Sequence, residues 1–382
     1  MSARSQRLPS GPPEFLLLLL YIAAVPLMSG THISLGGQRL LPADFLFVAV
    51  VLLWFPTALR GNLLLHLFEV FLLLYLGATV VSTLVSGAGY AGVVKVFYLV
   101  AVAGLTRRIV ERSPESAVTA WLAGTGAVLA GAFVGAVTFY LGWSSPTENL
   151  LLGHYGSLPP GHYPRLSSSF FGPNMLCNYL IVGATLAWYR RHRLLVAGIV
   201  GAALFTFSPG LGGMALALGQ SARRWRGAAA LGILLALLSL GLIVVSRVSL
   251  LEGHLAPSGR VLTWQQALAT WVDHPLTGAG PGALRIDVRY QLDRGGTMRM
   301  SDPHNVWLSV GAQTGILGVA ALLALILYSR RRTPSRLPGL RDALKTALVG
   351  AWLVHGLSGS LEDSRHLWVL LGMLAATEDR LT

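Results

Sequence analysis

Long apolar runs recur along almost the whole chain and constrain its fold more than any other feature. A helix needs about 20 such residues to cross a membrane, and several runs are shorter than this. Because 53% of the 382 residues are hydrophobic and only 12% are charged, the sequence predicts a single all-α polytopic membrane domain over 1–382 with about twelve transmembrane helices. The candidate spans are 15–28, 43–59, 63–84, 90–106, 117–141, 174–189, 194–208, 210–222, 227–246, 304–328, 342–358 and 366–377.

Two of these runs are open to more than one interpretation. The first follows Arg4 and Arg7 and resembles a signal peptide, but no convincing cleavage site comes after it. We therefore expect a retained first helix. In the region 194–222, Ser208-Pro209-Gly210 is either a tight turn between two spans or a break within one.

Basic residues alternate along the chain in step with the predicted spans. If the N-terminus is cytoplasmic, most of the 29 lysines and arginines fall in short cytoplasmic segments, as the positive-inside rule requires. We expect both termini to be cytoplasmic, and the net charge of +13 needs no nucleic acid as a partner. The single cysteine, Cys177, excludes an internal disulfide and a thiolate cluster for zinc.

The opposite side receives two large loops, 142–173 and 247–303, the second of which precedes the tenth span. They carry arginines on the face that normally avoids them. One interpretation is a site for an anion, and the other is that loops of this length escape the bias and carry solvated charges. The arginines are Arg165, Arg247, Arg260, Arg285, Arg289, Arg294 and Arg299.

The second loop contains a predicted amphipathic helix from Arg260 to about Val272. Arg260, Trp264 and Trp271 share one face at helical spacing. Two tryptophans beside an arginine favour a helix at the membrane interface. The glycine-rich turn 278–282 that follows is not a nucleotide loop, because no strand precedes it.

The segment 301–318 joins this polar loop to the next apolar run. Ser301 or Asp302 can cap a helix, and Pro303 suits its first turn. We expect His304 in that first turn, where the helix dipole disfavours the imidazolium and favours a neutral ring able to accept a proton.

Three glycines follow at spacings of four and three. Gly311, Gly315 and Gly318 therefore share one helix face. Such a face predicts close approach of another membrane helix.

Four features together resemble the bacterial O-antigen ligase and O-antigen polymerase superfamily. The segment from Arg165 to Asn174 runs from arginine through small polar and aromatic residues to Pro-Asn. The layout places the largest loop before the histidine helix. The other two features are Gly259-Arg260 with Trp264, His274-Pro275-Leu276, Gly278, Gly280 and Gly282, and then His304-Asn305, Leu308, Gly315 and Gly318.

The resemblance implies a metal-independent, cofactor-free glycosyltransferase at the outer face of the inner membrane, with a GT-C-like fold. Its donor is a glycan on undecaprenyl pyrophosphate. Ligases pass the glycan to a lipid A-core sugar and polymerases pass it to the next repeat unit. By resemblance, His304 is the general base and Arg260 binds the pyrophosphate. The substrate-binding residues are then expected to be Arg165, Asn174, Arg285 and Asn305.

Two positions depart from the family pattern. The family's Ser-Arg-Gly segment reads Ser208-Pro209-Gly210 here, so an arginine expected at Pro209 is missing. Arg165 or Arg285 is a candidate to compensate. Gln313 stands where glutamate is common.

Other charged residues have simpler interpretations. Glu69 and Lys95 lie inside predicted spans, and one expectation is that they pair with each other. Glu362-Asp363 with Arg365 and His366 forms an expected local ion pair in the last outer loop, although it could also line the site. The extracytoplasmic histidines show no metal-ligand spacing.

The residues by themselves also support glycosyl transfer, without the family resemblance. Transfer from a lipid pyrophosphate needs arginine at the leaving group and a base for the incoming hydroxyl. The alternative from another class is a lipid-linked oligosaccharide flippase. Transporters usually show two similar halves and polar residues at mid-membrane, whereas this chain places its polar residues in outer loops. The sequence leaves open whether the acceptor is a core sugar, a growing glycan or a protein.

Overall fold

The computed structural model describes most of the chain, and its helices dominate over three short β-hairpins. The predicted span at 227–246 and the predicted binding residue Arg285 lie outside the described residues. The described residues are 11–28, 33–35, 38–60, 65–142, 153–157, 163–221, 259–284, 286–290, 296–300, 302–331 and 334–378.

The described elements comprise three β-hairpins and a series of helices. The hairpins pair antiparallel strands, β1 (Ile33–Leu35) with β2 (Gln38–Leu40), β3 (Gly153–Ser157) with β4 (Pro164–Ser168), and β5 (Ile286–Tyr290) with β6 (Gly296–Met300). The helices are α1 (Pro13–Ala24), α2 (Pro42–Arg60), α3 (Leu67–Ser86), α4 (Ala91–Val110), α5 (Pro114–Tyr140), α6 (Pro173–Tyr189), α7 (Arg193–Leu204), α8 (Gly210–Ser221), α10 (Gly259–Asp273), α11 (Val306–Arg330), α12 (Pro338–Leu348), the π-helix η1 (Val349–Val354), the 3₁₀-helix η2 (His355–Leu357) and α13 (Arg365–Ala376).

Each predicted span within the described residues coincides with a helix, and the span 342–358 coincides with α12, η1 and η2 together. Four helices, α2, α3, α5 and α11, are long and apolar enough to cross a membrane by length and composition. Shorter apolar helices include α1, α7 and α13. The helical membrane class is therefore confirmed, while the number of twelve spans stays a prediction.

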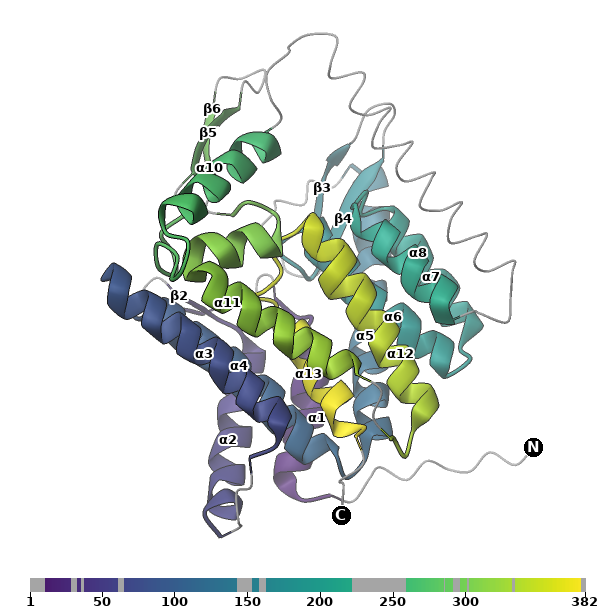
Figure 1. The fold of residues 1–382 in the computed structure, drawn as a ribbon. Helices are drawn as coiled ribbons and strands as arrows, with labels where there is room; N and C mark the ends of the chain where they lie inside the picture. Colours follow the sequence, from purple (N-terminus) through teal and green to yellow (C-terminus); the bar gives the residue numbers. More distant parts are fainter. Residues whose placement is uncertain are drawn as a thin grey trace, which may run out of the picture.

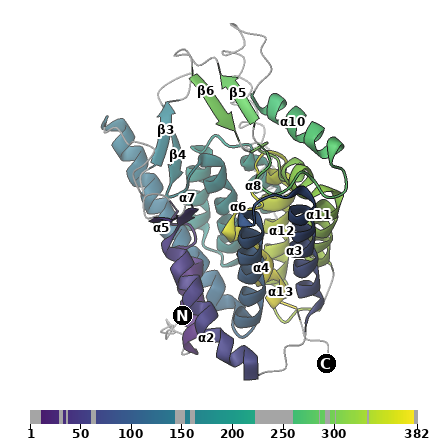
Figure 2. The same cartoon turned by 90° about the vertical axis from the view of Figure 1, so that its left-hand side faces the viewer.

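The helices lie side by side in one bundle with two different ends (Figure 1). The hairpins β3–β4 and β5–β6 and the helix α10 gather at one end, which we call the loop end. Figure 2 shows the same arrangement after a quarter turn. The opposite end holds Arg107, Arg108, Arg331 and Arg341, and we call it the basic end.

The core of the bundle surrounds α6, whose residues 176–187 are all buried. A helix that is apolar all round belongs in the middle of a bundle. Small residues allow close approach between α8 and η1: a Cβ on Gly213 would lie 2.4 Å from the carbonyl oxygen of Gly350, and the reverse distance is 2.5 Å. These two backbones therefore touch at a point where only glycine fits. Ser208-Pro209-Gly210 is a turn between α7 and α8, each of 12 residues.

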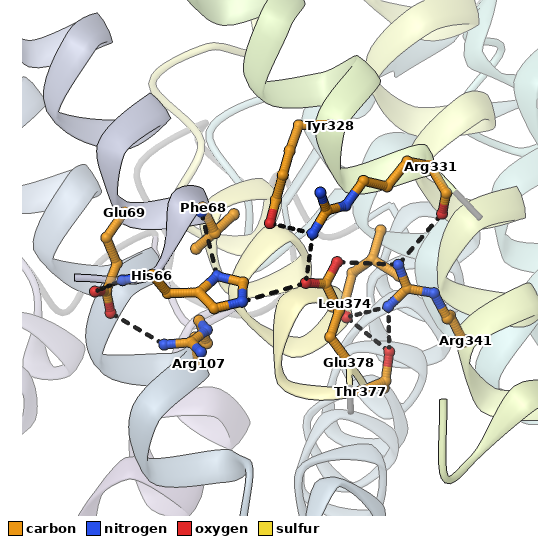
Figure 3. Close-up of polar contacts among 10 residues, drawn as sticks. All are labelled: His66, Phe68, Glu69, Arg107, Tyr328, Arg331, Arg341, Leu374, Thr377 and Glu378. Carbon is orange, nitrogen blue, oxygen red and sulfur yellow. Dashed lines mark hydrogen bonds and ion pairs between the residues drawn. The ribbon is translucent and has the colours of Figure 1, made fainter. Parts of the chain in front are cut away.

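Buried charges at the basic end are paired in a network (Figure 3). The carboxylate of Glu378 lies 3.0 Å from Arg341, 3.5 Å from Arg331 and 3.6 Å from the ring of His66. These residues come from the end of α13, from α12, from the end of α11 and from the start of α3. The network therefore ties four helices together.

The expected pair between Glu69 and Lys95 is wrong. Glu69 stands in the first turn of α3 and accepts hydrogen bonds from Arg107 and Arg108 at the end of α4. Lys95 stands near the start of α4 and pairs with Asp363 instead. Because α3 and α4 are antiparallel, the starts of the two helices lie at opposite ends of the bundle.

Candidate active site at the start of helix α11

Helix α11 is broken at Gly315, which has φ 64° and ψ −162°. A break in a helix leaves two carbonyl groups and two N–H groups without their normal partners. The loop after α10 supplies all four. Ala279 and Gly280 donate their N–H groups to the carbonyls of Ala312 and Gln313, at 2.9 and 3.0 Å. The N–H groups after the break, of residues 316 and 317, donate to the carbonyls of residues 275 and 276.

This exchange of backbone hydrogen bonds explains why both the loop after α10 and the break in α11 contain glycine. A Cβ on Gly315 would lie 2.3 Å from the carbonyl carbon of Leu276, and one on Gly278 would lie 2.3 Å from the carbonyl carbon of Gln313. Gly278 and Gly315 also have positive φ angles. The two segments that carry the family resemblance are therefore joined by backbone hydrogen bonds.

The predicted role of the glycine face of α11 is wrong. A Cβ on Gly311 would meet the ring of Trp271 at 2.4 Å, and one on Gly318 would meet Thr314 of the same helix. The face therefore receives α10 and its following loop, not another membrane helix. Sequence spacing identified the close approach but not the partner, because the break at Gly315 changes what each glycine faces.

The predicted amphipathic helix is observed as α10. Its indole Trp264 Nε1–H donates to the carbonyl of Pro303, at 2.7 Å. Arg260 is the second residue of α10, one turn before Trp264. The start of α10 therefore lies beside the residues that precede α11. The side chain of Arg260 falls outside the described part of the structure.

His304 lies before α11, which corrects the predicted helix start. The helix begins at Val306 with Asn305 as its N-cap, so Asp302 does not cap it, and the other predicted cap, Ser301, lies outside the described residues. His304 has φ 51°, a left-handed conformation that is uncommon outside glycine and interrupts a helix. Its N–H donates to Asp302 Oδ1 at 2.5 Å, and its Nδ1 lies 3.6 Å from Asp302 Oδ2.

The ring of His304 is accessible. Its side chain is 32% exposed, and Asp302 lies on its Nδ1 side. A carboxylate on that side favours the tautomer with the proton on Nδ1, which leaves the ring lone pair on Nε2. Nε2 is then the atom that can accept a proton.

Asn305, a predicted binding residue, is occupied by structural contacts. Its side-chain oxygen accepts hydrogen bonds from the N–H groups of Trp307 and Leu308, and its amide donates to the carbonyl of Leu357. Its own N–H donates to Ser360 Oγ. These contacts fix the start of α11 against the loop that follows η2.

The expected local ion pair in that loop is wrong. Arg365 pairs with Asp44 of α2, and Asp363 pairs with Lys95. Glu362 instead accepts a hydrogen bond from Ser309 of α11. The partners are far away in the sequence, so its local pattern could not reveal them.

Glu362 is the functional candidate that the sequence underrated. It is buried, and among the described residues its Oε2 has no hydrogen-bond partner. Burial, together with the nearby Asp363, raises the pKa of this carboxyl well above its usual range. A hydrogen-bond chain continues from Glu362 through Ser309 to Gln313, whose Oε1 accepts from the N–H of Gly282. The residue at 313 therefore links the Glu362 side of α11 to the glycine-rich loop.

Arg165 and Asn174 lie around the α7–α8 turn. Arg165, on β4, donates from Nε to the carbonyl of Thr206 at 3.0 Å, and the N–H of Leu166 donates to the carbonyl of Phe205. Asn174 stands in the first turn of α6, and its buried Oδ1 has no hydrogen-bond partner among the described residues. Arg165 is thus attached to the turn where the family arginine is absent.

A buried polar chain begins at the same turn. Ser208 Oγ lies 3.3 Å from His355 Nε2, and His355 Nδ1 lies 3.1 Å from Asn178 Nδ2. The side-chain oxygen Oδ1 of Asn178 lies 2.7 Å from His366 Nε2. The chain connects the α7–α8 turn with α6, η2 and α13, and only the tertiary structure brings these residues together.

The described residues contain no group of three or more histidine, cysteine or acidic side chains that could hold a metal ion. A bundle of apolar helices, with a histidine and a buried carboxyl beside a broken helix, defines a helical membrane protein with a candidate site at one end. Residues 175–323 match the O-antigen ligase family. This match confirms the resemblance to the O-antigen ligase and polymerase superfamily. No curated protein matches the chain.

Proposed function

We propose that this protein transfers a glycan from undecaprenyl pyrophosphate to a sugar hydroxyl at the outer face of the bacterial inner membrane. The family match over 175–323 supports glycan transfer of the ligase or polymerase type. The hydrogen bond from Trp264 to the carbonyl of Pro303 carries the assignment of the site. It joins the two chain segments that hold Arg260 and His304, which are 44 residues apart in the sequence.

His304 acts in this proposal as the general base. The acceptor hydroxyl gives its proton to Nε2 of His304 while its oxygen bonds to the anomeric carbon of the donor. Asp302 stabilises the ring as it becomes charged, because its carboxylate lies 3.6 Å from Nδ1. A base in this position typically contributes a factor of about 10²–10⁴ to the rate.

Arg260 acts on the leaving group. The bond between the anomeric carbon and the pyrophosphate oxygen breaks, and its electron pair stays on the pyrophosphate. Arginine stabilises this developing charge through paired hydrogen bonds to phosphate oxygens. Arg165, Asn174, Arg285 and Asn305 complete the proposed substrate site. Asn305 contributes by fixing the start of α11, since its polar atoms are already hydrogen-bonded.

The loop end faces the extracytoplasmic side in this proposal, and both termini are cytoplasmic. The grouping of Arg107, Arg108, Arg331 and Arg341 at the opposite end supports this orientation, because cytoplasmic segments carry the excess of basic residues. The acceptor then needs to be exposed at the outer surface. We expect no metal or cofactor to be required.

A transfer assay with purified protein tests the function. The protein receives an undecaprenyl-pyrophosphate glycan with or without lipid A-core, in the presence of a chelator. Product on lipid A-core identifies a ligase, and a longer glycan on the carrier identifies a polymerase. If no product forms but the carrier crosses to the other leaflet of a vesicle, the protein is a flippase and the proposal fails.

A further inference from the structure

A cavity of about 1000 Å³ lies at the basic end, among the ends of α6, α7, α8, α11 and α12. Its lining is strongly basic, with four cations against the single carboxylate of Asp342, a net formal charge of +3. Gln220, Ser221 and Thr346 add polar groups. The four cations are Arg191, Arg193, Arg330 and Lys345.

The neighbours of these cations in the sequence are paired. Arg331 and Arg341 contact Glu378 (Figure 3), and Arg190 lies 2.6 Å from a carboxylate oxygen of Glu115. Carboxylates at this end of the bundle therefore pair with Arg190, Arg331 and Arg341.

Three of the cavity cations differ from these paired neighbours. Within the described residues, no carboxylate lies in ion-pair contact with Arg191, Arg330 or Lys345. Lys345 follows the paired Arg341 by one turn of α12, and Arg330 directly precedes the paired Arg331. These three positive charges therefore line one cavity without a carboxylate in ion-pair contact, and an anion bound there would be attracted to all of them.

The backbone at Arg191 is also unusual. This residue has φ 60° in the turn between α6 and α7, which is uncommon for a residue other than glycine. The N–H of the next residue, His192, donates to the carbonyl of Ala187, so the turn is fixed by backbone hydrogen bonds. The strained turn gives the cavity an arginine, beside Trp188 of the same lining.

We propose that this cavity binds a phosphate-bearing anion. That chemistry is shared by the headgroup of an anionic phospholipid and by a soluble phosphate ester. Guanidinium groups make paired hydrogen bonds to phosphate oxygens, and basic pockets between membrane helices bind anionic headgroups. The site lies at the opposite end of the bundle from His304, so it does not depend on the proposed transfer reaction.

The test uses the purified full-length protein in neutral detergent, with native mass spectrometry and the melting temperature as readouts. The probes are dioleoyl phosphatidylglycerol, dioleoyl phosphatidylcholine and glycerol 1-phosphate. The cavity variant is Arg191→Gln with Arg330→Gln. The matched control is Arg60→Gln with Arg112→Gln, which removes the same charge from exposed positions that do not line the cavity.

The wild type and the control variant should bind at least one of the two anionic probes, phosphatidylglycerol or glycerol 1-phosphate. The cavity variant should bind that probe about tenfold or more weakly, because each basic residue contributes to headgroup attraction. Binding of phosphatidylglycerol alone identifies a lipid headgroup as the ligand. Binding of glycerol 1-phosphate with the same dependence on the cavity identifies a soluble ester. Three results would overturn the proposal. The first is that neither phosphatidylglycerol nor glycerol 1-phosphate binds, and the second is that the control variant loses as much affinity as the cavity variant. The third is that glycerol 1-phosphate does not bind while phosphatidylcholine binds as well as phosphatidylglycerol.

Discussion

At the basic end, Glu378 is buried between two arginines and a histidine, whereas at the loop end Glu362 is buried with a serine as its hydrogen-bond donor. Burial of a carboxylate is costly unless cations and hydrogen bonds compensate for it. Glu378 has that compensation and acts as a fixed tie between helices. For Glu362, burial and the nearby Asp363 raise the pKa, so the fold favours the protonated form, which avoids this cost.

The backbones at the two ends differ in the same way. At the basic end, α11 runs on without a break to Arg330, and its C-terminal residues pack into the charge network. At the loop end the same helix is broken at Gly315, and its start depends on a loop for four hydrogen bonds. Strained backbone and uncompensated polar groups occur together where the proposed chemistry takes place, as is common at functional sites. The Glu378 network at the basic end, by contrast, is expected to provide stability.

The largest expected effect comes from His304→Ala. The variant should lose about 10²–10⁴-fold in transfer rate, because it lacks the base for the acceptor hydroxyl. Its melting temperature should stay near that of the wild type, since the side chain is 32% exposed. Transfer assays and thermal unfolding in detergent measure both. Full activity of His304→Ala would remove the loop end from the proposed mechanism.

Glu378→Ala should show the opposite pattern. Removing one partner from a buried ion pair typically costs about 3–5 kcal/mol, because Arg341 is left buried without a counter-charge. Denaturant unfolding measures the loss. The transfer rate per folded molecule should be unchanged. A selective loss of activity without a loss of stability would contradict the division between the two ends.

Gly315→Ala should disturb the loop end through packing alone. The added Cβ would lie 2.3 Å from the carbonyl of Leu276, and the residue has positive φ. Overpacking of this kind typically costs about 1–3 kcal/mol, and it should detach the loop that holds α10 to α11. The control is Gly126→Ala, where nothing lies within 4 Å of the added Cβ. Hydrogen exchange at the N–H groups of Ala279 and Gly280, which donate to α11, should rise in the first variant and not in the second.

The smallest effect is expected for Glu362→Gln. Because burial and Asp363 raise the pKa of the wild-type carboxyl, the fold favours its protonated form, and an amide of the same shape should change stability by less than about 1 kcal/mol near pH 4.5. The folded pKa is raised, so above this pH the unfolded carboxyl loses its proton first and wild-type stability falls as pH rises. Glu362→Gln lacks this fall. Melting temperatures of the two proteins should therefore diverge with rising pH, and parallel curves would show that the fold does not raise the pKa of Glu362.

Much of the helical layout followed from local pattern. The runs near α3, α5 and α11 are apolar over membrane-spanning lengths, and each is a helix close to the predicted bounds. The family match over 175–323 likewise confirms a resemblance carried by short motifs such as His304-Asn305. Both signals depend on residues that are near one another in the chain, so the sequence contains them directly.

The start of α11 was predicted less well, for a physical reason. Ser301, Asp302 and Asn305 are all good capping residues. The choice of Asn305 depends on contacts with Leu357 and Ser360, more than 50 residues away. Local preference alone could not rank three equivalent caps.

The sequence by itself determined that the chain forms a bundle of apolar helices, that its polar residues collect in two loops, and that His304 lies close to the start of a helix. Hydrophobicity and charge act on each segment separately, so these properties do not need the fold. Tertiary structure decided which groups meet: the loop 275–280 with the break at Gly315, Glu362 with Ser309, and Glu378 with Arg341. Those contacts depend on how the helices pack, which no single segment specifies.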